Sequence, residues 1–193
     1  MKALILHLAV LLALFAAHFA LPAYHHGAMA RILVLATFAM GYNIAFGYTG
    51  LLSLGHALFL GAGMMSAGLA IQHFGLAAAP ALLLGSLAGA AAATLTGLLA
   101  LRTAGVSLMI VTLMFAQAGY LTLLYFGAVT GGDEGFPLPA ATRQAFGFDL
   151  SQEGPRYLAA LALFATGLLA NLALIRTRFG RTMIAMRENE ERS

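Results

Sequence analysis

One stretch of the chain decides which solvent it can fold in. From Ile32 to Gly132 the only formally charged side chain is Arg102. Over the whole chain 9% of residues are charged and 61% are hydrophobic, whereas soluble domains contain about 25% charged residues. These residues cannot supply the polar shell that a water-soluble fold needs. The sequence therefore excludes a soluble enzyme, a disordered tail and a nucleic-acid-binding protein, and it predicts a chain that crosses a lipid bilayer several times.

The apolar runs set the expected architecture. A helix needs about 20 apolar residues to cross the hydrocarbon core. The runs are continuously apolar, which favours helices over the alternating strands of a membrane barrel. We therefore expect an all-α polytopic membrane protein, a single domain built as a bundle of about six spans. The expected spans are residues 3–21, 32–46, 51–71, 76–101, 106–126 and 157–175.

The charges that remain predict an orientation. The loop 127–156 carries four acidic side chains, whereas the tail after residue 175 carries five arginines. Basic loops tend to stay on the cytoplasmic side, so we expect the tail in the cytoplasm and the acidic loop outside. Six spans then place both termini in the cytoplasm. The basic residues are orientation signals at span ends and indicate contact with membrane lipid, not with nucleic acid.

The densest polar feature is a glycine-rich segment near residues 41–56. Glycines in a membrane helix often mark a broken or re-entrant segment that lines a cavity. Asn43, Ser53 and His56, with Gln117 further along, are costly at bilayer depth unless they face protein or water. The residues alone leave two interpretations equally open: a helix-packing segment with satisfied hydrogen bonds, or the wall of a translocation pathway. A Ser53–His56 hydrolase pair is disfavoured, because no acidic residue lies within the membrane region.

Two segments outside the spans could contact partners. The loop Thr130–Gly135 presents Asp133 and Glu134 at a glycine-rich turn, which is either a solvated turn or a contact for an extracytoplasmic protein. In the tail, Phe179, Met183 and Met186 follow helical spacing among arginines. Such a basic amphipathic helix either lies on anionic lipid or presses into a groove of a cytoplasmic partner. A catalytic residue and a metal site are not predicted, since the adjacent His25 and His26 lack further ligands.

Three segments in order resemble one family. The run Gly47–Ala57, then Thr112–Gln117 followed by Thr130–Gly135, and finally Arg178–Glu190 are similar to permease subunits of branched-chain amino acid ABC importers. The resemblance covers about residues 31–193. Members of the family continue with further spans, so the chain would correspond to the N-terminal part of the family's permease domain, and 176–193 to the start of its cytoplasmic coupling loop.

The resemblance implies a function and a set of partners. Such permeases lie in the bacterial cytoplasmic (inner) membrane and import Leu, Ile or Val with a second permease subunit, cytoplasmic ATPase subunits and an extracytoplasmic substrate-binding protein. ATP binds to the ATPase subunits, and a phosphate-binding GxxxxGK[ST] motif is missing here; we therefore expect neither a cofactor nor enzymatic activity. Urea and short-amide permeases are related and remain an alternative, as does a non-transporting scaffold or channel-like fragment. The residues expected at the ATPase contact are Arg178, Phe179, Gly180, Arg181, Arg187 and Glu188.

Overall fold

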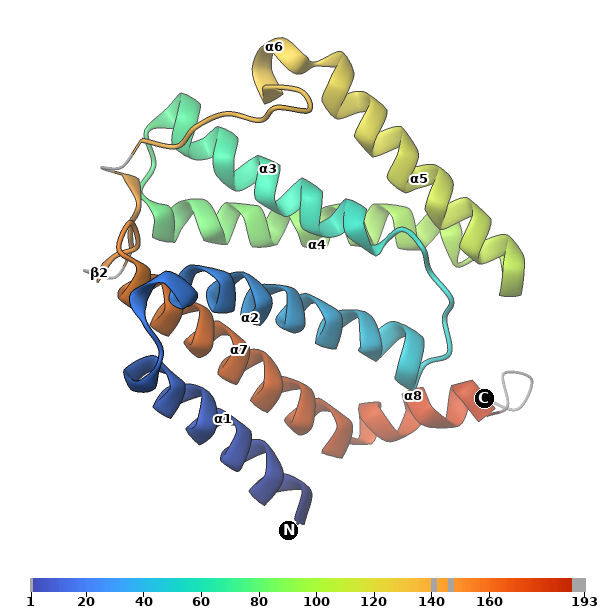
Figure 1. The fold of residues 1–193 in the computed structure, drawn as a ribbon. Helices are drawn as coiled ribbons and strands as arrows, with labels where there is room; N and C mark the ends of the chain where they lie inside the picture. The colour runs from blue at the N-terminus through green and yellow to red at the C-terminus, as the bar shows by residue number, and fades with distance from the viewer. Residues whose placement is uncertain (1, 140–141, 146–147, 189–193) are drawn as a thin grey trace. The chain divides into compact units, whose positions relative to one another are not determined.

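The computed structural model describes residues 2–139, 142–145 and 148–188, and most of them are helical (Figure 1). Their contacts divide the chain into two compact units, residues 1–44 with 148–193 and residues 45–147, which are described separately. The elements are α1 (Lys2–Ala20), α2 (Ala23–Asn43), the π-helix η1 (Ile44–Tyr48), α3 (His56–Phe74), α4 (Ala78–Ala100), α5 (Gly105–Tyr125), α6 (Gly127–Thr130), β1 (Gln144–Ala145), β2 (Phe148–Asp149), α7 (Glu153–Arg176) and α8 (Arg178–Glu188).

The helices confirm the predicted all-α polytopic fold. Five helical stretches of the described chain are long and apolar enough to cross a membrane: Ala23–Tyr48, α3, α4, α5 and α7. The first predicted span corresponds to α1, whose shorter apolar stretch is Ile5–Ala20. Large apolar side chains remain on the surface of the chain; Leu12, Leu83 and Leu87 are each more than 60% exposed. Hydrocarbon is the solvent that accepts such a surface.

The second span starts earlier than predicted. We expected it at residue 32, where the continuously apolar run begins, but α2 begins at Ala23, directly after Pro22. The fixed φ of proline suits a helix start. Helical spacing then places His26, Ala30 and Leu33 on one face, and all three are buried. A histidine that reads as interfacial in the sequence is therefore part of the helix–helix contact.

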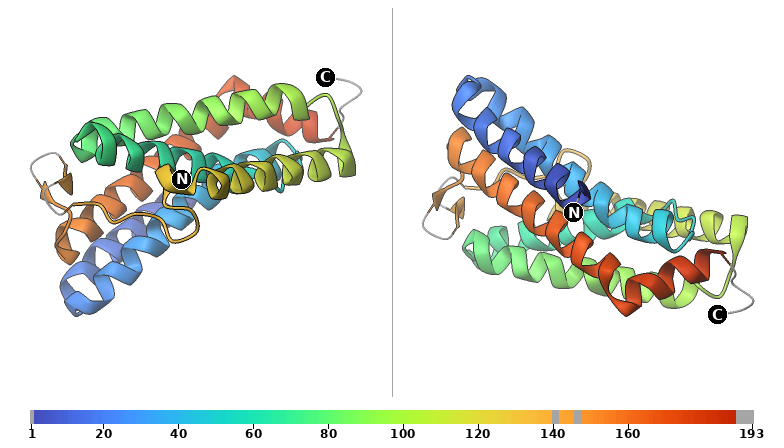
Figure 2. Two further views of the ribbon diagram at one scale, coloured as in Figure 1. Left: turned by 90° about the horizontal axis from the view of Figure 1, so that it is seen from above. Right: turned by 90° about the horizontal axis from the view of Figure 1, so that it is seen from below.

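The first unit is built on the pair α2 and α7, with α1 packed on α7. Figure 2 shows these helices side by side. Gly167 allows the close approach, because a Cβ at that position would lie 2.9 Å from the methyl group of Thr37. Tyr157 is fully buried and donates a hydrogen bond to the carbonyl of Leu14 at 2.6 Å. The buried core of this first unit consists of Ala30, Leu33, Tyr157, Ala160 and Leu161.

The second unit is built on the antiparallel pair α3 and α4, with α5 beside them. The stripe of small residues in α4 forms part of this contact. A Cβ on Gly85 would lie 2.5 Å from the carbonyl oxygen of Gly63 and 2.9 Å from Cβ of Ala67, and one on Gly89 would lie 3.0 Å from the carbonyl of Phe59. The small residues therefore let two helix backbones nearly touch. The prediction of the single permease domain stays a prediction.

The glycine contact gives a matched pair of variants. We expect Gly85→Ala to destabilise the fold by about 1–3 kcal/mol, the usual cost of forcing an extra carbon into a packed contact. Thermal unfolding in detergent measures the loss. Gly97→Ala is the control, since a Cβ there meets no described atom within 4 Å. Equal stability of the two variants would contradict the assigned contact.

Candidate functional site

The polar segment predicted to break a membrane helix does break one. The helix that starts as α2 widens into η1 and stops at Tyr48, and regular structure resumes at His56. Gly50 adopts a left-handed backbone with φ of 72°, a conformation that glycine adopts at little cost. The hydroxyl of Thr49 donates to the carbonyl of Ala45 at 2.5 Å, and the N–H of Leu51 donates to the same carbonyl at 3.0 Å. At the start of the broken segment, residues 49–55, the Thr49 side chain and the Leu51 N–H therefore satisfy the carbonyl of Ala45 at the end of the helix.

Its other end is attached to α5. The backbone N–H of Leu54 donates to Oγ1 of Thr112 at 3.1 Å, and that hydroxyl in turn donates to the carbonyl of Leu108 at 2.9 Å. Gly55 lies directly on the backbone of Thr112, so that any Cβ at position 55 would overlap the Thr112 carbonyl oxygen. Thr112 is buried. The threonine supplies the acceptor that a helix would otherwise have provided.

Ser53 and His56 are brought together by this geometry. Oγ of Ser53 accepts the N–H of Gly55 at 3.3 Å and lies 3.1 Å from Nδ1 of His56. Ser53 is buried, whereas His56 is half-buried with its ring edge-on to Phe59 at 5.3 Å. The serine hydroxyl thus provides a partner for a backbone N–H and for the histidine ring at the start of α3.

The other two predicted pathway residues lie elsewhere. Gln117 is exposed on α5, five residues beyond Thr112, and Asn43 is exposed as the last residue of α2 in the other compact unit. The prediction missed Thr112 as part of the site. The sequence feature that could have indicated Thr112 is a polar side chain in an apolar helix, at the first position of the motif Thr112–Gln117. Only the tertiary contact with Leu54 shows what it does.

The acidic loop is folded into a fixed turn. Oγ1 of Thr130 donates to the carbonyl of Leu123 at 2.7 Å and accepts the N–H of Gly132 at 3.2 Å. The turn needs glycine at 131, 132 and 135, where φ is 75°, 60° and 69°. Asp133 and Glu134 are exposed at its tip, and Asp133 accepts a 3.4 Å hydrogen bond from the hydroxyl of Tyr120. A contact of these two acids with a partner stays a prediction.

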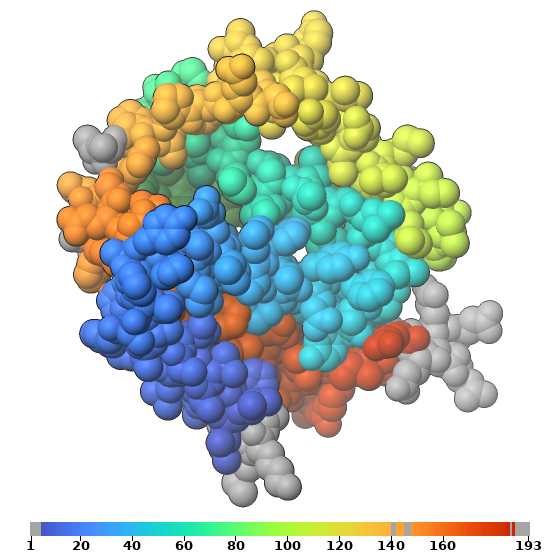
Figure 3. Space-filling view, viewed as in Figure 1, coloured from blue at the N-terminus to red at the C-terminus, as the bar shows by residue number. Residues whose placement is uncertain are grey.

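The loop that follows the acidic turn, residues 136–139, packs against α3. The ring of Phe136 lies on Gly68, where a Cβ would come 2.8 Å from the ring. Leu138 packs on the core of Ala70, Ile71 and Ala81. Figure 3 shows this part of the chain lying along the surface of α3. The loop therefore presents its acidic tip from a supported base.

The predicted ATPase contact is a short helix turned sharply against the end of α7. Thr177 caps α8, since its hydroxyl accepts the N–H of Gly180 at 3.1 Å. Gly180 is buried on the backbone of Leu174 and Ile175, which leaves no room for a side chain.

The predicted docking residues of α8 differ in exposure. Met183 is buried, whereas Phe179 is 64% exposed. The side chains of Met186 and Glu188 lie outside the described set, and Arg178, Arg181 and Arg187 are exposed.

These observations define a class: a polytopic membrane protein with a helix broken at a polar, glycine-rich segment that is anchored on a neighbouring helix. The family of the branched-chain amino acid transport system permease component matches residues 26–193. The chain belongs to this family, which confirms the predicted resemblance. Membership and the apolar helices together support a multi-pass protein of the bacterial inner membrane.

Two curated members of this family are similar to the chain in sequence. It is similar to the high-affinity branched-chain amino acid transport system permease protein LivM of Salmonella typhimurium strain LT2 and to that of Escherichia coli strain K12. Each is 30% identical over 182 residues, which cover 82% of this chain and 42% of the relative. The chain thus spans less than half the length of these relatives. No solved structure matches it.

The anchor on α5 can be tested by removing one hydroxyl. We expect Thr112→Val, which keeps the shape of the side chain, to leave the Leu54 N–H without its acceptor and to destabilise the fold by about 1–3 kcal/mol. Hydrogen exchange of residues 49–56 should accelerate, as measured by mass spectrometry in detergent. Thr112→Ser keeps the hydroxyl and should exchange like the unchanged protein. Slow hydrogen exchange of residues 49–56 in both variants would contradict the assignment of Thr112 to the site.

Proposed function

We propose that the chain is a transmembrane permease subunit of an ATP-driven importer of branched-chain amino acids and forms part of the translocation pathway. The observation that carries this proposal is the broken segment 49–55, fixed to α5 through Leu54 and Thr112. Irregular backbone is tolerated at membrane depth where it is buried in protein or lines a cavity. Membership of the permease family supports the second possibility.

The chemistry of the segment suits the proposed substrate. Leu, Ile and Val are zwitterions with an aliphatic side chain, so a pathway for them needs a few polar groups among apolar walls. Ser53 in the segment lies beside the half-buried imidazole of His56, the first residue of α3, in a chain that is otherwise strongly apolar. We assign Ser53 and His56 to the pathway wall and keep Asn43 and Gln117 as further candidates. A scaffold that transports nothing would not require this polar group.

The proposed partners follow from the two segments outside the spans. We place α8 and both termini in the cytoplasm, where Phe179 and the exposed arginines would dock on an ATPase subunit. Asp133 and Glu134 would face the extracytoplasmic substrate-binding protein. A second permease subunit and membrane lipid would cover the exposed apolar helix faces. In this arrangement ATP is hydrolysed by the partner subunits, and the chain itself catalyses no reaction.

Purification from the native membrane tests the function. We expect the tagged chain to recover ATPase subunits and a second permease subunit, and liposomes containing the complex to accumulate labelled leucine in the presence of ATP. His56→Gln should lower this uptake, whereas His73→Gln, on an exposed histidine at the far end of α3, should not. Uptake of urea in place of leucine would favour the related amide permeases. A complex without an ATPase would contradict the proposal.

Charge reversal tests the docking assignment. We expect the double variant Arg181→Glu and Arg187→Glu to lose the ATPase subunits during purification, because two exposed cations on α8 become anions. The membrane fold should persist, as judged by an unchanged elution volume and helical content. Arg143→Glu reverses an exposed charge in the loop that we place outside, and it should retain the ATPases. ATPase subunits that stay bound to the double variant would place their contact elsewhere.

A further inference from the structure

An amide side chain lies inside the last of the apolar spans. Asn171 belongs to α7 and precedes Arg176, the last residue of that helix, by about 8 Å of helix. A polar side chain at this depth is costly unless it is hydrogen-bonded, and it often marks a functional place in a membrane protein. The residues assigned above to the pathway wall do not include Asn171.

The amide faces the last turn of α2. One helical turn earlier on α7, a Cβ on Gly167 would lie 2.9 Å from the methyl group of Thr37 and 3.6 Å from Cε of Met40. The next turn of α7 continues this close contact, and Nδ2 of Asn171 donates to the carbonyl oxygen of Met40 at 3.4 Å. The NH₂ group must be the one that faces Met40, because a carbonyl oxygen can only accept.

The other half of the amide has no partner. Oδ1 of Asn171 is buried without a hydrogen-bond partner among the described residues. A buried acceptor without a partner costs more free energy than one long hydrogen bond contributes. A leucine has the same branching and would pack here without that cost. The stability of the contact between α2 and α7 therefore does not account for an asparagine at this position.

The carbonyl that Asn171 contacts belongs to the turn in which α2 changes its hydrogen bonding. Ile44 is the first residue of η1, and its N–H is shared between the carbonyls of Gly41 and Met40. The Asn171 amide competes with this N–H for the Met40 carbonyl. A side chain that enters the hydrogen bonds between residues i and i−4 distorts a helix, and π-helical turns are frequent at functional sites. The contact thus lies where the helix widens.

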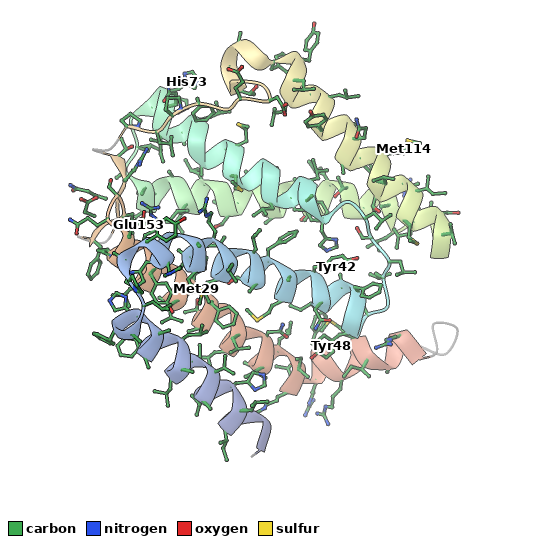
Figure 4. All side chains as sticks on the ribbon, viewed as in Figure 1. Met29, Tyr42, Tyr48, His73, Met114 and Glu153 are labelled. Atoms are coloured by element: carbon green, nitrogen blue, oxygen red, sulfur yellow. The ribbon has the colours of Figure 1, made fainter. Side chains whose placement is uncertain are left out.

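We propose that Asn171 is a positioning residue for the transport pathway. Its hydrogen bond to the Met40 carbonyl weakens the regular helical bond there and favours the widening of α2 into η1. The broken segment 49–55 then starts at a place that α7 determines. Figure 4 labels Tyr48, the residue at which η1 ends. The effect on uptake rests on the transport function proposed above, whereas the effect on the helix does not depend on what is transported.

Asn171→Leu separates positioning from stability, because it removes both the donor and the acceptor without a partner. We expect the full chain in detergent to unfold at the same temperature as the unchanged chain or at a higher one. Hydrogen exchange of residues 44–48, measured by mass spectrometry, should slow as the Ile44 N–H bonds fully to Met40. In liposomes with the complete complex, uptake of labelled leucine should fall about threefold, the factor that one hydrogen bond between membrane helices supports. If the leucine variant does not fold, Asn171→Ala decides in its place.

Thr166→Val is the matched control on α7. Its hydroxyl donates within its own helix, to the carbonyl of Leu163 at 2.9 Å, so this variant should keep both the exchange and the uptake of the unchanged chain. Asn171→Gln keeps an amide and should resemble the unchanged chain more than the leucine variant does.

The outcomes separate this proposal from the transport function. Unchanged exchange of residues 44–48 in Asn171→Leu would overturn the role of Asn171, and so would slower exchange with full uptake. A lower unfolding temperature without a change in exchange would make Asn171 an ordinary packing residue. If the unchanged complex takes up no leucine but exchange still slows in Asn171→Leu, the transport function is contradicted, and the effect of Asn171 on α2 is supported.

Discussion

The structure depends on the cost of leaving a backbone hydrogen-bonding group without a partner in hydrocarbon. A regular helix satisfies such groups within itself, which explains why most of the described chain is helical. The stretch 49–55 interrupts these helices, and it persists because other parts of the chain replace the missing hydrogen bonds. Ala45 accepts at one end, and the hydroxyl of Thr112 accepts at the other. Without that hydroxyl the break would cost free energy with nothing to offset it.

Glycine has two separate roles in this arrangement. Gly50 provides a left-handed turn that ends the helix, whereas Gly55, Gly63 and Gly85 let one backbone lie against another. Both roles serve the same site. The turn frees a short irregular segment, and the close contacts hold that segment and α3 against α5 and α4. A transport pathway built here would have a rigid support beneath a polar lining, which suits a substrate with charged and aliphatic parts.

The buried polar groups differ in whether their hydrogen-bonding atoms have partners among the described residues. Ser53, Thr112 and Thr130 each have partners that account for their hydroxyl groups. Nδ1 of His18, Nδ1 of His26 and Oε2 of Glu153 are buried without a hydrogen-bond partner among the residues that the structure describes. A packed interior rarely leaves such groups unpaired unless something else occupies the place.

Much of the architecture follows from the sequence alone, since the near absence of charge between residues 32 and 132 forces helices in a membrane. The glycines near residue 50 locate the break, and the three ordered motifs indicate the family. The start of α2 and the role of Thr112 could not be predicted in this way. His26 reads as an interfacial residue until Tyr157 is packed against it, and Thr112 reads as one polar side chain among apolar ones. Leu54 and Thr112 are 58 residues apart, and Leu14 and Tyr157 are 143 apart. Local composition determines whether a segment is a helix, but a hydrogen bond between distant segments exists only once helices have packed, and packing is a property of the whole chain.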